Sequence, residues 1–148
     1  MRNILIVEDH AFSAFCLSRI LESSLDVCQV RMVSNSVEAR AAVLSEDFDL
    51  IILDGDLGAG DGINCNGPAL ADLLWSENPW LSIVVWSDSE KMCGAFAHVF
   101  KRHQKAFNEH FCWPKMVGKA RVQSFFARCF PSIPYRAIQD SGSMDKAS

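Results

Sequence analysis

Three carboxylates follow two apolar segments of the sequence that are typical of buried strands. Glu8 and Asp9 come directly after the run 4–7, and Asp54 ends the run 49–54. Because the carboxyl ends of parallel strands meet at one edge of a sheet, we expect these side chains to lie together. Like charges at such a place are relieved best by a hard divalent cation that prefers oxygen ligands. The sequence therefore predicts a magnesium site, although Asp9 taken alone would fit a helix cap or a solvated loop.

Two further polar side chains are candidates for the same edge. Ser87 ends the predicted fourth strand and would bring a hydroxyl there, although an ordinary turn or N-cap serine has the same pattern. Lys115 is the only basic residue close to a predicted strand end on that edge, and an exposed lysine at the start of a helix would look the same. The sequence pattern therefore fits either a functional or a structural role for both residues.

The elements that must position these residues alternate along the chain. Short apolar runs predict strands at 3–7, 27–33, 49–54, 81–87 and 109–113. Longer amphipathic stretches predict helices at 12–21, 36–45, 68–75, 89–103 and 116–129, with Ser36 and Ser89 as N-caps and Pro68 in a first turn. This alternation is typical of βα units around a parallel sheet, so we predict an α/β domain. The segment 55–67 holds five of the eight glycines and predicts a loop beside Asp54.

Length and composition limit what the chain can be. Its 148 residues, 49% of them hydrophobic and 22% charged, suit one globular domain, which we place at 1–130, followed by a polar and flexible tail at 131–148. The net charge of −4 gives no overall positive field for a nucleic-acid partner. No run of about 18 apolar residues suits a membrane, and the first apolar run is too short for a signal peptide, so we expect a cytoplasmic protein.

The six cysteines are scattered, without a CxxC pair or a zinc-type grouping with the four histidines. We therefore expect reduced thiols and no disulfide in the native protein. Phe125 and Phe126 are adjacent, so one helix stripe cannot bury both of them. We expect one of the two on a surface where a partner or a second copy docks, which would make a homodimer.

Several motifs in a fixed order resemble the receiver domain of two-component response regulators, over about residues 2–130. The residues that carry the resemblance are 4–10 (ILIVEDH), 49–54 (DLIILD), Asp61-Gly62, 83–87 (IVVWS) and Pro114. The resemblance implies a doubly wound, flavodoxin-like fold with a five-stranded parallel sheet in the order 2-1-3-4-5 and helices on both faces. It also implies a stand-alone signalling protein, because no room remains for an output domain.

The same resemblance implies roles for individual residues. Asp54 would accept a phosphoryl group from a histidine kinase or phosphotransfer protein. Mg²⁺ would be held by Asp9, Asp54 and the backbone carbonyl of Asp56, with Glu8 acting through water. Ser87 would donate a hydrogen bond to the phosphoryl oxygen, and a downstream protein would bind the altered surface around the fourth and fifth strands. Such a domain catalyses only its own phosphorylation and dephosphorylation and is not an enzyme in the usual sense.

The sequence departs from the family around the fifth strand. Trp113 stands where the family has a lysine before the proline, His110 replaces an aromatic residue, and Asp88 adds a negative charge after Ser87. Because Trp113 occupies the inward-pointing position, we expect Lys115 not to reach the acidic edge. The two-residue offset from Trp113 to Lys115 keeps the same face in an extended chain and argues the other way.

Two other functions compete with the phosphorylated receiver. The departures would fit a degenerate receiver that binds a partner without phosphorylation. The residues 54–57 (DGDL) together with Ser87 resemble motifs of haloacid-dehalogenase-like phosphatases, which also form an aspartyl phosphate. Such a phosphatase needs an acidic pair after its lysine, whereas only Asp140 and Asp145 follow Lys115. The phosphatase is therefore the weakest of the three.

Overall fold

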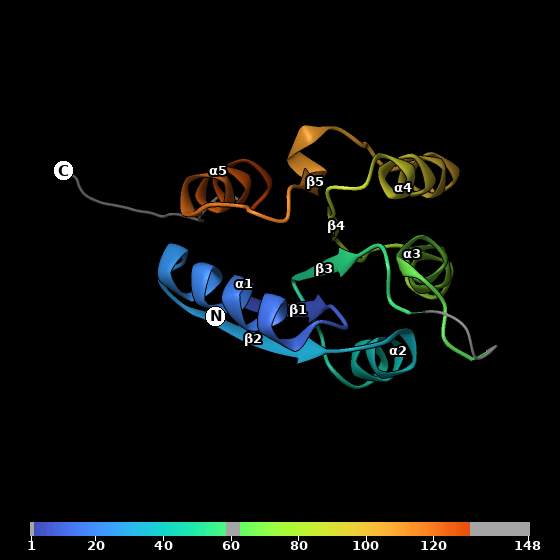
Figure 1. The fold of residues 1–148 in the computed structure, drawn as a ribbon, viewed down its shortest axis with the longest axis horizontal. Helices are drawn as coiled ribbons and strands as arrows, with labels where there is room; N and C mark the ends of the chain where they lie inside the picture. The colour runs from blue at the N-terminus through green and yellow to red at the C-terminus, as the bar shows by residue number, and fades with distance from the viewer. Residues whose placement is uncertain (1, 59–62, 131–148) are drawn as a thin grey trace. The chain divides into compact units, whose positions relative to one another are not determined.

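The computed structural model describes residues 2–58 and 63–130, which form parts of two compact units, Met1–Val117 and Gly118–Ser148. The first unit contains β1 (Arg2–Val7), α1 (Ala11–Ser24), β2 (Cys28–Val33), α2 (Ser36–Ser45), β3 (Leu50–Asp54), α3 (Gly67–Glu77), β4 (Ile83–Trp86), α4 (Glu90–Arg102), a 3-10 helix (Glu109–Phe111) and β5 (Cys112–Trp113). The described part of the second unit contains α5 (Lys119–Cys129). Figure 1 shows these elements in order.

The five strands form one parallel sheet in the order β2-β1-β3-β4-β5, as predicted. Every residue of β3 and β4 is buried. Continuous apolar strands of this kind are expected where helices cover both faces of a parallel sheet. The fold is therefore the doubly wound, flavodoxin-like α/β fold.

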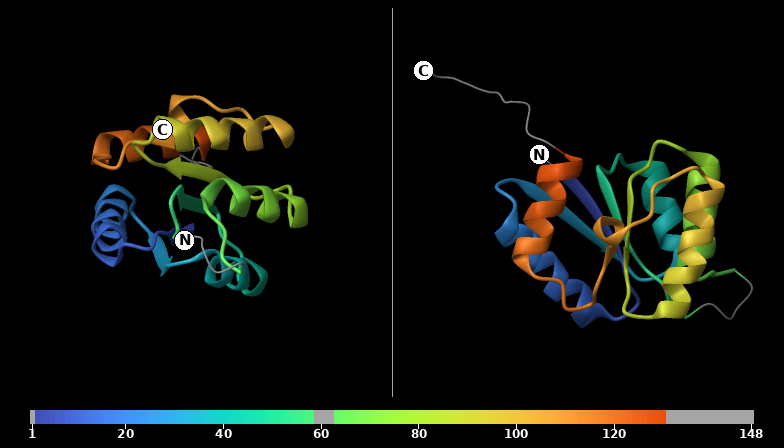
Figure 2. Two further views of the ribbon diagram at one scale, coloured as in Figure 1. Left: turned by 45° about the vertical axis from the view of Figure 1, so that its right-hand side comes forward. Right: turned by 90° about the horizontal axis from the view of Figure 1, so that it is seen from above.

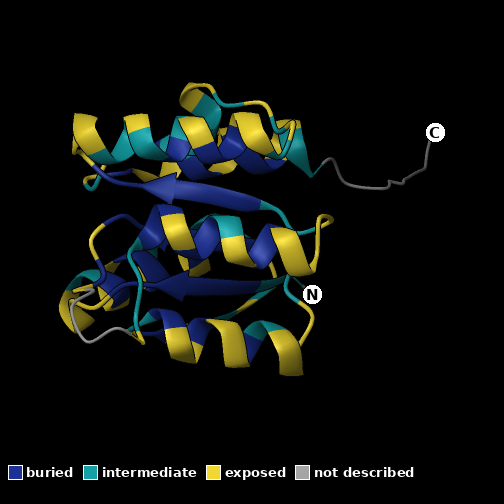
Figure 3. Cartoon of the chain, turned by 90° about the vertical axis from the view of Figure 1, so that its right-hand side faces the viewer, coloured by how far each residue is buried: buried dark blue, intermediate teal, exposed yellow. Residues whose placement is uncertain are grey.

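Helices of the first unit cover both faces of the sheet. α1 packs on one face, and α2, α3 and α4 lie side by side on the other (Figures 1 and 2). The central strands β3 and β4 are buried between helices whose outer surfaces are exposed (Figure 3). A hydrophobic core lies on the α2–α4 face, where strand residues meet helix residues: Leu5, Val7, Leu53, Val85, Leu74 and Phe100. This arrangement leaves the carboxyl ends of the strands open at one edge.

The fifth strand is shorter than predicted. Glu109 and His110 form part of the 3-10 helix, and only Cys112 and Trp113 pair with β4. The Asn108 side chain accepts a hydrogen bond from the His110 backbone and thereby caps the 3-10 helix. The polar cap therefore outweighs the strand propensity of the segment.

Helix starts also differ in detail from the predictions. Ser89 caps α4 and Pro68 lies in the first turn of α3, as predicted, but the cap of α2 is Asn35, and Ser36 is the first helical residue. The last helix begins at Lys119, because Gly118 rather than a residue near 116 is its N-cap.

Two other sequence predictions meet different outcomes. Phe125 and Phe126 are both buried, with ring centroids 5.4 Å apart, so the expectation that one of them forms an exposed docking surface is wrong. Asp61-Gly62 and the predicted tail 131–148 lie outside the described residues. In the part of the chain that the structure describes, no helix combines the length and hydropathy that crossing a membrane requires.

Candidate functional site

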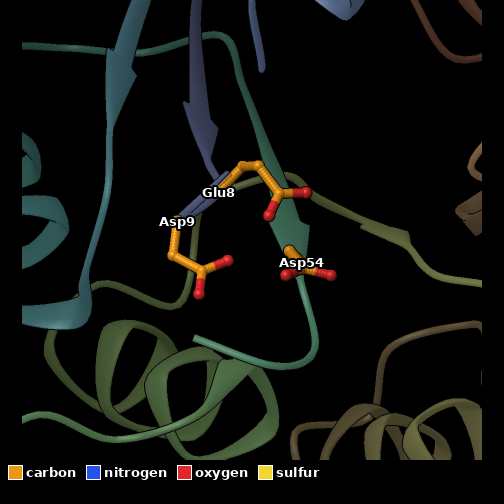
Figure 4. A group of neighbouring side chains, drawn as sticks. All are labelled: Glu8, Asp9 and Asp54. Carbon is orange, nitrogen blue, oxygen red and sulfur yellow. The ribbon is translucent and has the colours of Figure 1, made fainter. Parts of the chain in front are cut away.

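The three predicted carboxylates meet at the carboxyl edge of the sheet. Val7 is paired with Leu53, so Glu8 and Asp54 follow at the same level of two neighbouring strands. Figure 4 shows the side chains of Glu8, Asp9 and Asp54 facing one space. One carboxylate oxygen from each residue lies within 4.8 Å of the others. The sheet register therefore builds the acidic cluster that the sequence predicts.

The members of this cluster differ in exposure. Glu8 and Asp54 are buried, at 4% and 6% exposure, whereas Asp9 lies at the surface. Loss of water around Asp9 raises the pKa of its carboxyl, and a hydrogen bond and charge repulsion from Glu8 raise it further. Without a cation other than Lys115, the surroundings of Asp9 therefore oppose ionisation of its carboxyl.

Lys115 reaches the acidic cluster, so the expectation that it falls short is wrong. Its Nζ lies 3.0 Å from Asp54 Oδ1 and also donates to Glu8 Oε1. Trp113 is completely buried, and its Nε1 donates to the His110 carbonyl. The two-residue offset therefore decides the outcome: Lys115 leaves the strand on the side of the cluster, and its long side chain spans the remaining distance.

Two residues on the neighbouring strand end fix the position of Lys115. The Trp86 ring centroid lies 3.9 Å from Lys115 Nζ, and the Trp86 indole N–H donates to the Lys115 carbonyl at 3.3 Å. Asp88 Oδ1 accepts a hydrogen bond from the Lys115 backbone at 3.0 Å. Asp88, whose added negative charge is a departure from the family, thus holds the turn that presents the lysine. No sequence signal indicated either contact, because both depend on where β4 and β5 end.

Ser87 is buried at the end of β4, beside the cluster. Its backbone N–H donates to the Trp113 carbonyl at 3.0 Å, and its Oγ accepts a hydrogen bond from the Ser89 backbone at 3.1 Å. The hydroxyl therefore accepts a hydrogen bond in the turn before α4 and keeps its O–H as a donor.

The loop after β3 brings a further carboxylate close to Asp9. Asp56 is exposed, and its Oδ1 accepts a hydrogen bond from the Gly58 backbone at 3.2 Å. Gly58 has φ +66°, a left-handed conformation that favours glycine, and a Cβ there would lie 3.8 Å from Asp9 Oδ2. The charge of Asp56 also raises the pKa of Asp9. The loop therefore lies beside the Asp9 side chain.

The site combines a buried carboxylate, a fixed ammonium group and additional carboxylate oxygens. The three carboxylates and Lys115 leave a formal charge of −2 when all are ionised. An all-oxygen set of this charge matches the preference of Mg²⁺, so the residues present fit that metal. A carboxylate next to a cation and a metal can act as a nucleophile toward phosphorus.

The chain matches one protein-family model. Residues 4–106 match the response regulator receiver domain, which is more than half of the chain. The match includes the acidic cluster and Ser87 but ends before Lys115. A search of curated proteins found no match.

Solved structures of response regulators share the fold. NtrX from Brucella abortus is similar with a TM-score of 0.68 and 21% identity, over 85% of this chain and 26% of that chain. A CheY-like receiver domain protein from Methanospirillum hungatei has a TM-score of 0.65 and 17% identity, over 84% and 89%. A response regulator from Burkholderia pseudomallei, solved with a phosphorylated aspartic acid, calcium ion and citrate, has a TM-score of 0.63 and 23% identity, over 86% and 65%. The chain thus spans about a quarter of that NtrX chain.

Proposed function

The chain belongs to the response regulator receiver family, and on that premise we propose that it accepts a phosphoryl group on Asp54 from a histidine kinase or phosphotransfer protein. The reaction would need Mg²⁺ and would take place in the cytoplasm. The single observation that carries the proposal is the contact of Lys115 Nζ with Asp54 Oδ1 at 3.0 Å, within the acidic cluster. It supplies the cation that the sequence lacks at position 113.

In the proposed transfer, an Asp54 oxygen attacks the phosphorus of a phosphohistidine. The new P–O bond forms as the P–N bond breaks, and the donor imidazole leaves with the electron pair. Lys115 pairs with Asp54 before transfer and with the phosphoryl oxygens afterwards, so its charge stabilises the transition state. Burial of Asp54 limits the access of bulk water to the acyl phosphate.

Asp9, Asp54 and the backbone carbonyl of Asp56 would hold Mg²⁺ directly, with Glu8 acting through water. The metal, when bound, neutralises the attacking carboxylate and orients the incoming phosphoryl group. Desolvation and repulsion from Glu8 raise the pKa of Asp9, and the charge of a divalent cation would offset both effects, which supports this assignment.

Phosphorylation of Asp54 would change the hydrogen bonds of Ser87. Its Oγ can keep accepting from the Ser89 backbone while its O–H donates to the phosphoryl group, and the resulting shift of Ser87 would move the start of α4, because Ser89 is the N-cap of that helix. A downstream protein would recognise the changed surface around β4, β5 and α4.

We place the phosphodonor on a groove next to Lys115. This groove, of about 380 Å³, lies between α1 and the segment after β5 and is lined by Phe12, Cys16, Ile20, Trp86, Met116 and Val117. Phe12 and Met116 are 70% and 92% exposed, so apolar surface is available beside the site. A donor protein must bring its phosphohistidine to Asp54, and this groove adjoins the lysine that contacts Asp54.

The phosphorylation test uses acetyl phosphate and Mg²⁺ with intact-mass measurement. We expect the wild-type chain and Asp26→Asn, a control on the exposed turn after α1, to gain one phosphoryl group. Asp54→Asn should gain none. An unmodified wild type would overturn the proposal and favour the degenerate receiver, which binds a partner without phosphorylation. Catalytic turnover of phosphate esters would favour the haloacid-dehalogenase-like phosphatase.

The docking test separates donor binding from chemistry. We expect Phe12→Ser to slow transfer from a phosphorylated phosphotransfer protein about tenfold and to leave the acetyl phosphate reaction unchanged. Phe15→Ser is the matched control, since Phe15 is an exposed α1 phenylalanine that does not line the groove. Equal slowing with both phosphodonors would contradict the docking site.

A further inference from the structure

Two cysteines from different elements are in contact on the α4 side of the sheet. Cys93 lies in the first turn of α4, and Cys112 is the first residue of β5. Their Sγ atoms lie 3.1 Å apart, although 19 positions separate the two residues in the sequence. Both residues are partly exposed, and Cys112 packs against the core on that face. The fold thus places two thiols side by side where a small oxidant can reach them.

From this geometry we propose that Cys93 and Cys112 form a redox modification site. A peroxide would convert the two thiols into a reversible disulfide that fastens α4 to β5. All six cysteines lie in the described residues and carry free thiols in the structure, so the pair is reduced there. The proposal concerns oxidising conditions and leaves the expectation of a reduced native protein in place.

Disulfide formation brings the two sulfurs closer together. They must approach from 3.1 Å to about 2.05 Å, the length of a disulfide bond. In the first step, one thiolate attacks the peroxide, the O–O bond breaks, and a sulfenic acid and hydroxide form. In the second step, the neighbouring thiol attacks that sulfur, the S–O bond breaks and water leaves. Two thiols lose two electrons in total, and one hydrogen peroxide becomes two waters.

The new bond would act next to Ser87. Cys93 Sγ donates to the Ser87 carbonyl at 3.9 Å, and the Ser87 N–H donates to the carbonyl of Trp113, the residue after Cys112. A disulfide would hold the first turn of α4 at a fixed distance from β5. Ser87 is hydrogen-bonded to residues of both elements, so its movement would be restrained as well. We therefore expect slower movement of Ser87 and α4, and slower phosphorylation. The effect on phosphorylation rests on the proposed function, whereas the disulfide itself rests on the thiol geometry alone.

The disulfide is tested on the full chain by peptide mass. The protein is treated with hydrogen peroxide, its remaining thiols are alkylated, and trypsin is added. Cleavage after lysine and arginine places Cys93 in peptide 92–101 and Cys112 in peptide 106–115. We expect these peptides as one linked species that dithiothreitol separates, from protein that runs at the mass of one chain on a non-reducing gel. Separate peptides at a peroxide dose that oxidises the exposed Cys16 would overturn the proposal.

Two variants and two rate measurements complete the test. Cys93→Ser should lose the linked species, and the control Cys16→Ser should keep it. Amide hydrogen exchange in residues 90–93 should slow at least threefold in the oxidised wild type, a readout that needs no phosphorylation. Acetyl phosphate should modify the oxidised protein at least threefold more slowly than the reduced protein. Unchanged amide hydrogen exchange in the oxidised protein would show that the disulfide does not restrain α4. If acetyl phosphate modified the protein in neither redox state, the proposed function would be overturned. Amide hydrogen exchange would then still test whether the disulfide fastens α4 to β5.

Discussion

The ammonium group of Lys115 rests on the face of the Trp86 ring, 3.9 Å from the ring centroid, while the Trp86 indole N–H holds the backbone carbonyl of the same lysine. Trp86 is buried at the end of β4, in register with Asp54. Trp86 therefore contacts Lys115 at its ammonium group and at its backbone, and so positions the lysine next to Asp54. Under the proposed function, this tryptophan and the lysine after the proline would together take the place of the lysine that the family has before the proline.

Removing the lysine charge tests this replacement. We expect Lys115→Ala to slow phosphorylation of Asp54 by acetyl phosphate about 100-fold, because a fixed charge near the transferred group is lost. Lys101→Ala, an exposed lysine in the last turn of α4, is the matched control and should react at the wild-type rate. Equal rates for both variants would show that Lys115 contributes no catalytic charge.

Changing the ring tests whether Trp86 positions Lys115. Phenylalanine offers a weaker face for a cation and no N–H donor, so Trp86→Phe should weaken the contact by about 1 kcal/mol and slow phosphorylation roughly fivefold. The two residues act together, so adding Trp86→Phe to Lys115→Ala should cost little more. Rate losses that simply multiply in the double variant would contradict the positioning role. Phosphorylation kinetics on the four proteins of the cycle give the answer.

Magnesium binding should depend on Asp9. Loss of one of three carboxylates lowers the charge and the number of oxygen ligands, so Asp9→Ala should bind Mg²⁺ at least tenfold more weakly by isothermal titration. Mg²⁺ should also raise the melting temperature of the wild type more than that of the variant. Asp26→Ala serves as the control for a lost surface charge. Equal affinity in wild type and Asp9→Ala would remove Asp9 from the site.

The raised pKa of Asp9 sets a direction for stability against pH. An acid whose pKa is higher in the folded state binds its proton more tightly there, so its contribution favours folding at low pH. That contribution is lost as the pH rises from the ordinary value of 3.8 through the raised pKa. At neutral pH without Mg²⁺, Asp9→Asn should therefore melt at a higher temperature than the wild type. Thermal denaturation in EDTA at pH 3.5 and pH 7 checks whether the difference grows with pH.

Two glycines offer a matched pair of stability tests. A Cβ on Gly67 would overlap the Asp54 carbonyl oxygen and lie 2.6 Å from Phe96 Cζ, so Gly67→Ala should destabilise the protein by about 3 kcal/mol. Gly94 lies within α4 with nothing within 4 Å of such a Cβ. Gly94→Ala should stabilise the protein by about 0.5–1 kcal/mol, because alanine favours helix. Urea denaturation measures both changes, and a tolerated Gly67→Ala would contradict the tight contact.

The order of the elements could be predicted from the sequence because each strand of the sheet centre is a continuous apolar run. Residues 50–53 are all apolar and buried, and such a continuous apolar strand is typical of a parallel sheet that helices cover on both faces. The acidic cluster was predictable for the same reason, since parallel strands bring their carboxyl ends to one edge. The end of β5 was not predictable, because the Asn108 cap competes there with strand pairing.

The fold, the acidic cluster and the family can be predicted without the structure, because they follow from local hydrophobic patterns and from motifs in a fixed order. Long-range packing instead decided the reach of Lys115, which depends on Trp86 and Asp88 at another strand end. It also decided the burial of Phe125 and Phe126 and the contact of Cys93 with Cys112. Such contacts join residues far apart in the chain, and their distances depend on side-chain packing that no local pattern encodes.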